Sequence, residues 1–107
     1  MKIDRKKVIH AFETYVENYD KKEEKVRLKI EHTYRVSQLC ESIACSLKLG
    51  SDDTALAWLL GMLHDVGRFE QLKNYGTFID AESIDHALYG AEILFDRGKI
   101  RDYIEDD

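Results

Sequence analysis

The chain has 107 residues, of which 44% are apolar and 35% charged, and its formal net charge is −5. This length and composition are typical of one globular domain covering residues 1–107, and they exclude an intrinsically disordered chain. Duplex nucleic acid is not an expected partner because no clustered basic face is visible, whereas a phosphorylated substrate is compatible with the acidity if a metal ion supplies positive charge.

The N-terminal segment MKIDRKKVIHAF is charged from its start and lacks the apolar core of a signal peptide. No segment approaches the roughly 18 apolar residues that a membrane-spanning helix needs. Cys40 and Cys45 are five positions apart, which places them on different sides of a helix rather than in disulfide geometry. We therefore expect a cytoplasmic protein without a membrane segment.

Two helices are predicted in the first half of the chain. The first spans about residues 4–19, with Asp4 as its N-cap, and its apolar face consists of Val8, Phe12, Tyr15, Val16 and Tyr19. The second spans about residues 23–47 and stops before Gly50. Its apolar stripe consists of Leu28, Val36, Leu39, Ile43 and Leu47. His32 falls within this stripe, at a position where an aliphatic residue would be expected.

A third helix is predicted from about residue 52 to 66, with Ser51 as its N-cap. Its segment ALAWLLGMLHDV is apolar on nearly every side, so we expect this helix in the middle of the fold. Gly61 would let a neighbouring backbone come close. Gly67 is expected to end the helix, which places His64 and Asp65 on its last turn.

Residues 68–107 are predicted to form further short helices. Residues 68–82 predict a short helix and a loop, and Ser83 is a plausible cap for a helix that runs to about residue 97, before Gly98. Residues 99–107 predict a last amphipathic piece. No pair of strands is indicated, so the expected fold is all-α, a bundle of about five helices.

The pair His64 and Asp65 is the most informative chemical feature. A carboxylate is unfavourable both inside an apolar environment and at a helix C-terminus, and a bound cation would reverse that penalty. The alternative is a C-terminal histidine beside a solvated aspartate. For His32 the alternative is a core histidine bonded to a backbone carbonyl, and for His10 we expect a surface position. Two imidazoles and one carboxylate on packed helices would suit a divalent ion such as Mn, Fe, Co, Ni or Zn.

Three segments carry a resemblance to a known family: HTYRV at 32–36, GMLHDVGRF at 61–69 and DAESIDHALYGAEIL at 80–94. Together they resemble the HD-domain superfamily of metal-dependent phosphohydrolases, over roughly residues 25 to 100. The resemblance implies a helical bundle that holds one or two divalent metal ions (Mn, Fe, Co, Ni, Mg or Zn), with His32, His64 and Asp65 as ligands. It also implies hydrolysis of a phosphate ester, often in a nucleotide.

Two further positions follow from the same resemblance. Arg68 stands where relatives carry a Lys or Arg that could clamp a phosphate, and its alternative is a surface arginine. His86 resembles the additional histidine of binuclear members, and its alternative is a packing or substrate-facing histidine. Together with Asp65, which could orient the attacking water, these are the expected catalytic residues. The GYP signature is missing, so specificity for cyclic dinucleotides is not supported.

One feature departs from the family pattern. Members complete the first metal's shell with an aspartate on a later helix, and Asp102, Asp106 and Asp107 lack the helical context of that residue. We therefore expect either the N-terminal part of an HD domain or a naturally short, truncated one. A second protomer could cover the missing wall and form a homodimer.

Three functions remain open at this point. The first is a metal-dependent phosphohydrolase. The second is a catalytically incomplete module that binds a metal, a nucleotide or a partner without turnover. The third is a structural helical domain whose histidines are core residues.

Overall fold

The computed structural model describes residues 3–80, 83 and 85–104, and these residues form helices without any strand. The elements in chain order are α1 (Arg5–Val16), α2 (Glu24–Ser46), α3 (Ser51–Leu63), α4 (Val66–Tyr75), α5 (His86–Ala91), the π-helical turn η2 (Glu92–Asp96) and the 3₁₀ turn η3 (Lys99–Asp102). The prediction of an all-α fold is confirmed. None of the described helices is both long and apolar enough to cross a bilayer.

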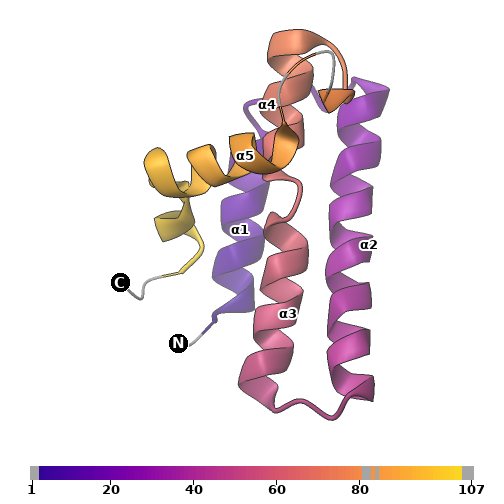
Figure 1. Ribbon diagram of the computed structural model, residues 1–107, viewed down its shortest axis with the longest axis vertical. Coiled ribbons are helices and arrows are strands. Elements are labelled where there is room, and N and C mark those ends of the chain that lie inside the picture. The colour runs from indigo at the N-terminus through magenta and orange to yellow at the C-terminus, as the bar shows by residue number, and fades with distance from the viewer. Residues whose placement is uncertain (1–2, 81–82, 84, 105–107) are drawn as a thin grey trace.

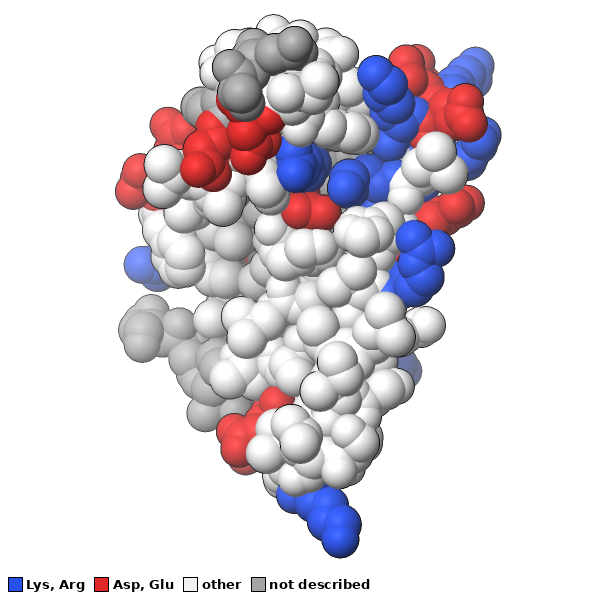
Figure 2. Space-filling model, turned by 45° about the vertical axis from the view of Figure 1, so that its right-hand side comes forward, with Lys and Arg blue, Asp and Glu red and all other residues white. Residues whose placement is uncertain are grey.

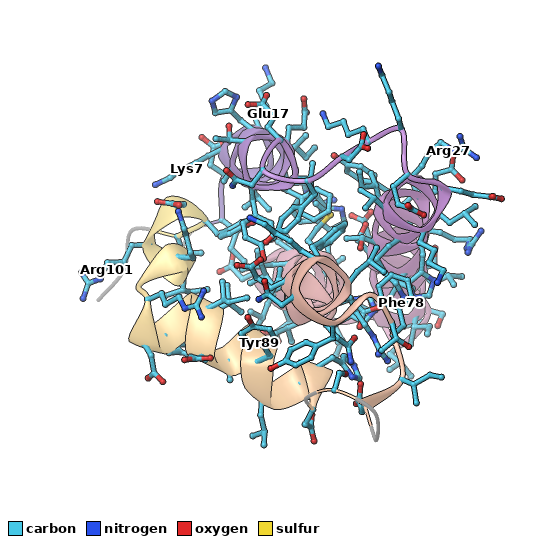
Figure 3. The ribbon with its side chains drawn as sticks, turned by 90° about the horizontal axis from the view of Figure 1, so that it is seen from above. Lys7, Glu17, Arg27, Phe78, Tyr89 and Arg101 are labelled. Atoms are coloured by element: carbon cyan, nitrogen blue, oxygen red, sulfur yellow. The ribbon has the colours of Figure 1, made fainter. Side chains whose placement is uncertain are left out.

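The helices form a bundle with α3 and α4 at its centre. In Figure 1, α3 runs between α1 and α2, and α4 continues upward from it, while α5 crosses the upper part of the bundle at a steep angle. Seen from above, α1, α2 and the segment that follows α5 surround the central column (Figure 3). The core is one cluster that includes Phe12 of α1, Met62 of α3 and Phe69 of α4. The expected central place of the third helix is thus confirmed.

Helix α1 begins as predicted and ends earlier. The Asp4 carboxylate accepts hydrogen bonds from the backbone N–H groups of Lys6 and Lys7, at 3.0 and 3.3 Å, so it is the N-cap. Of the predicted apolar face, Val8, Phe12, Tyr15 and Val16 are buried. The helix stops at Val16 rather than near Tyr19.

The predicted apolar stripe of α2 is wrong except at Val36, which is half-buried. Leu28, Leu39, Ile43 and Leu47 are between 50% and 65% exposed. The buried face instead carries Val26, Thr33, Ser37 and Ala44. The reason is a close helix–helix contact: a Cβ added to Gly61 of α3 would lie 2.6 Å from the Ser37 Cα, so only small side chains fit on the α2 face that meets α3. The large aliphatic residues therefore lie on the exposed face of α2, which the sequence pattern predicted to be buried. The expectation that Gly61 permits a close backbone approach is confirmed.

The predicted helix end at Gly67 is also wrong. The chain bends at Asp65, whose φ and ψ are −118° and 20°, and α4 starts at Val66 with Gly67 inside it. Gly67 is needed there because a Cβ would lie 2.3 Å from the carbonyl oxygen of His86 on α5. At the other end of α3, Gly50 is the N-cap and Ser51 the first helical residue.

The C-terminal pieces differ in detail from the expected single helix. Asp85, rather than Ser83, caps α5 through its side chain. The helix then passes into η2, and Gly98, with φ of 76°, separates η2 from η3. The described part of the expected amphipathic piece buries Tyr103, whereas residues 105–107, including Asp106 and Asp107, lie outside the described residues.

Candidate metal centre

The three predicted ligands lie together where α2 passes the junction of α3 and α4. His32 comes from the middle of α2, and His64 and Asp65 form the junction. The Nε2 atoms of His32 and His64 lie 3.5 and 3.1 Å from the same Asp65 oxygen, Oδ2. Their ligating atoms all lie within 4.8 Å of one another, close enough for one cation to contact all three.

Asp65 is the centre of this cluster. Its side chain is only 8% exposed, and the Lys29 ammonium donates to Oδ2 at 3.2 Å. The second oxygen, Oδ1, lies 3.5 Å from His86 Nε2 and 3.9 Å from Arg68 Nε. Burial tends to raise the pKa of Asp65, but the hydrogen bond from His64 and the charges of His64 and Lys29 outweigh it, so the pKa lies well below its usual value. The group is thus a buried, ionised carboxylate ringed by cationic side chains.

The bend at Asp65 places its carboxylate between two helix ends of opposite dipole sign. Asp65 precedes the first residue of α4, so it lies at the positive end of that helix dipole as well as at the negative end of α3. The expected dipole penalty on this carboxylate is therefore offset. Its need for a cation comes from burial rather than from the helix terminus.

The two histidines of the cluster are held differently. His64 Nδ1 lies 2.6 Å from the Gly61 carbonyl oxygen, which fixes the ring and directs Nε2 toward Asp65. The hydrogen bond with Asp65 raises the pKa of His64. Partial burial and the nearby Lys29 charge lower the pKa of His32, which favours a neutral imidazole. The His32 side chain is 36% exposed and its Nε2 faces the Asp65 carboxylate, so the alternative of a core histidine bonded to a backbone carbonyl is wrong.

His86 and Arg68 border the same carboxylate through a second network. His86 Nδ1 lies 2.8 Å from Asp80 Oδ2, and this hydrogen bond is the main reason that the pKa of Asp80 falls to about 2. Arg68 Nη1 donates to Asp80, to Gln71 and to the Phe78 carbonyl oxygen. The Arg68 side chain is 19% exposed, so it is not a surface arginine, and its buried Nε has no hydrogen-bond partner in the described part of the chain.

Three residues of this site were missed from the sequence. Lys29 lies one turn before His32 on α2, so helical spacing alone could have identified it. Asp80 and the fully buried Gln71, which bond to each other at 2.8 Å, depend on how the loop after α4 folds back. No sequence pattern over a few residues predicts the contact between Gln71 and Asp80.

Two other candidates lie elsewhere. His10 is exposed on α1, as predicted. Asp102 is exposed in η3, 4.0 Å from the Lys99 ammonium, and it belongs to neither of the His and carboxylate clusters found in the described ranges. Both cysteines are free thiols, as expected from their spacing.

A known protein family matches the part of the chain that contains these residues. The model of the HD domain matches residues 30–107, which includes His32, His64, Asp65 and His86. The chain belongs to the HD-domain family. No curated protein and no solved structure matches it. HD domains are in general metal-dependent phosphohydrolases, and the His and Asp cluster of this HD domain is one that could hold a metal ion.

Proposed function

We propose that this HD domain hydrolyses a phosphate ester, and that His32, His64 and Asp65 hold the divalent cation it uses. The observation that carries the proposal is the convergence of two imidazole nitrogens and one buried carboxylate oxygen within 4.8 Å. Helices that are far apart in sequence supply these atoms, so the convergence is a property of the fold.

The donor set fits a divalent metal ion. Imidazole nitrogen and carboxylate oxygen suit Mn, Fe, Co, Ni or Zn. His64 and His86 each direct one ring nitrogen to a carbonyl or carboxylate oxygen, an arrangement that orients metal-binding histidines. Lys29 already places one positive charge against Asp65 Oδ2, which marks where a cation is stabilised. A divalent cation held by His32, His64 and Asp65 would lower the pKa of a bound water molecule and polarise a phosphoryl oxygen.

The surrounding side chains have distinct parts in the proposed reaction. Asp65 Oδ1 accepts a hydrogen bond from the attacking water and orients it. Arg68 Nε, which lies 3.9 Å from this oxygen and has no hydrogen-bond partner among the described residues, stabilises negative charge on the phosphoryl group. Asp80 holds Nδ1 of His86, so Nε2 is the atom that can exchange a proton with the substrate.

The test compares purified wild-type protein with His64→Ala and Asp65→Ala, supplied in turn with Mn, Co, Ni and Mg. The substrates are p-nitrophenyl phosphate and a set of nucleotides, and phosphate release is measured. We expect activity that requires the cation and falls by at least about a hundredfold in both variants. His10→Ala, which changes an exposed histidine that does not belong to the cluster, is the control. Undiminished turnover in Asp65→Ala would contradict the proposal.

A second candidate is a module that binds a metal or a nucleotide without turnover. It is favoured by one observation: the His32, His64 and Asp65 cluster contains a single carboxylate among the described residues. Calorimetry with Mn and with ATP distinguishes the two. Binding without any phosphate release supports the module, and release of phosphate that depends on Asp65 excludes it.

A further inference from the structure

A groove opens beside the metal centre along one face of α2. Its volume is about 460 Å³, and it is lined by Lys25, Leu28, Lys29, Glu31, His32, Arg35 and Phe78. Two of these residues, Lys29 and His32, also contact Asp65. The groove is therefore continuous with the group formed by His32, His64 and Asp65, called the cation cluster below because it could hold a cation. A substrate held at the cation cluster extends into the groove.

The groove is positively charged although the chain as a whole is acidic. Its lining contains three basic side chains and one acidic one. Because Lys29 is paired with Asp65, the charges of Lys25, Arg35 and Glu31 leave a net of +1 with His32 neutral, whereas the chain carries −5. Lys25 and Arg35 are exposed, and neither forms an ion pair with another side chain among the residues described. Figure 2 shows Lys and Arg side chains, with Asp and Glu side chains among them, over the upper part of this face, where α2 begins, above a broad uncharged region. The groove therefore attracts anions.

The basic side chains are spread along the groove rather than concentrated at the cation cluster. Lys29 precedes His32 by about one turn of α2 and Arg35 follows it by about one turn, while Lys25 lies two turns before it. From Lys25 to Arg35 the helix rises by roughly 15 Å. A single phosphate group at the cluster cannot contact all of these side chains. A chain of linked phosphates can follow the groove and contact several of them.

Phe78 fixes the far wall of the groove. Its ring packs against α2, and the Lys29 ammonium lies 5.2 Å from the ring centroid. Its carbonyl oxygen accepts a hydrogen bond from Arg68. Figure 3 shows Phe78 and Arg27 on different sides of α2, so Arg27 is a basic residue of the same helix that does not line the groove.

We propose that this groove is a binding site for an oligophosphate chain, in which one phosphate group reaches the cation cluster while Lys25, Lys29 and Arg35 contact the phosphate groups linked to it. The inference rests on the proposed function and narrows its substrate class from phosphate esters in general to molecules that carry two or more linked phosphates. Both nucleoside polyphosphates and inorganic polyphosphate have this chemistry.

Binding of four probes to the metal-free protein tests the groove separately from catalysis. The probes are orthophosphate, AMP, tripolyphosphate and ATP, measured by calorimetry at low and at moderate salt. We expect tripolyphosphate and ATP to bind at least about tenfold more tightly than orthophosphate and AMP, and salt to weaken that binding. Tighter binding of ATP than of tripolyphosphate identifies a nucleoside polyphosphate as the preferred source, and equal binding identifies the phosphate chain alone.

Charge variants test whether the named residues are responsible. Lys25→Gln and Arg35→Gln should each weaken tripolyphosphate binding by about threefold, and the double variant by about tenfold. Glu31→Gln removes the one negative charge of the groove and should strengthen binding by about twofold. Arg27→Gln is the matched control because it removes the same charge from another face of α2. All these side chains are exposed, and far-UV circular dichroism verifies that each variant folds.

Two outcomes would overturn the inference. The first is tripolyphosphate binding no tighter than orthophosphate, and the second is a Lys25 and Arg35 double variant that matches Arg27→Gln. Metal-dependent hydrolysis of p-nitrophenyl phosphate by the wild-type protein tests the proposed function by itself, because this substrate has a single phosphate group. Tripolyphosphate binding no tighter than orthophosphate in a protein with that activity would therefore overturn this inference and leave the proposed function standing.

Discussion

At the scale of single residues, the environments of two buried tyrosines show how burial and hydrogen bonding act separately. Tyr15 Oη donates to the Val66 carbonyl oxygen at 3.0 Å and accepts a hydrogen bond from Tyr19 Oη at 3.1 Å. The Tyr103 hydroxyl is also buried, but it has no hydrogen-bond partner among the described residues. The first hydroxyl links α1 to the start of α4, directly after Asp65, and the second contributes no such link.

We therefore expect Tyr15→Phe to lower the free energy of unfolding by about 1 kcal/mol, since a buried hydrogen bond between two helices is lost. Tyr103→Phe should leave stability unchanged or slightly raised, because it removes a hydroxyl that is buried without a partner. Urea unfolding at pH 7 measures both. A larger loss in Tyr103→Phe than in Tyr15→Phe would show that the hydrogen-bond assignment is wrong.

Tyr15 also predicts how stability falls in alkali. Burial raises the pKa of Tyr15 from 10.0 to about 12, so the folded state favours the neutral phenol. The unfolded chain ionises first as pH rises, so this stabilisation is complete below pH 10 and is lost between pH 10 and about 12. The free energy of unfolding of the wild type should decline across this range, and that of Tyr15→Phe should decline less. Parallel curves for the two proteins would refute the prediction.

At the scale of helices, glycines set the distances that bring the site together. The Gly61 contact with Ser37 brings α2 against α3, so that His32 on one helix reaches Asp65 after the other. Gly67 does the same for α4 and α5, which carries His86. The cation cluster therefore depends on residues without side chains as much as on the three residues proposed as its ligands.

Gly61→Ala should force α2 away from α3, because its Cβ would lie 2.6 Å from a backbone atom that cannot rotate aside. We expect a loss of about 1–3 kcal/mol in stability. Metal affinity should fall at least about tenfold, since His32 moves away from the other two ligands.

Calorimetric titration with Mn measures that affinity, and Gly50→Ala is the matched control because nothing lies within 4 Å of its added Cβ. Unchanged metal binding in a folded Gly61→Ala protein would mean that His32 is not a ligand.

At the scale of the whole molecule, the proposed cation would add a further link between segments that already contact each other through packing and an ion pair. The His32, His64 and Asp65 cluster lies between α2 and the central α3–α4 column, and Lys29 forms an ion pair across the same gap. A ligand that binds only the folded state stabilises it by mass action. Metal binding should therefore be visible in the unfolding of the entire domain.

Saturating Mn or Co, at about a hundred times the dissociation constant, should stabilise the protein by roughly 2.7 kcal/mol and raise the midpoint of thermal unfolding. Excess EDTA should reverse the shift. The shift should disappear in His64→Ala and persist in His10→Ala, which differential scanning calorimetry can measure. An equal shift in both variants would place the bound metal outside this cluster.

The sequence by itself determined the helical class, the N-cap Asp4, the buried face of α1 and the resemblance that identifies His32, His64 and Asp65. These features depend on near neighbours: helical periodicity, capping groups and short motifs act over a few residues. The HD-domain match later supported the same family assignment.

Only the tertiary structure decided which face of α2 is buried, where the central helix bends, and which cations surround Asp65. The α2 stripe of large aliphatic residues predicted the wrong face, because close contact with Gly61 selects small side chains there. The contacts of Lys29, Arg68 and Asp80 around the site join residues up to 36 positions apart. No local preference encodes such contacts, since they follow from how the helices pack.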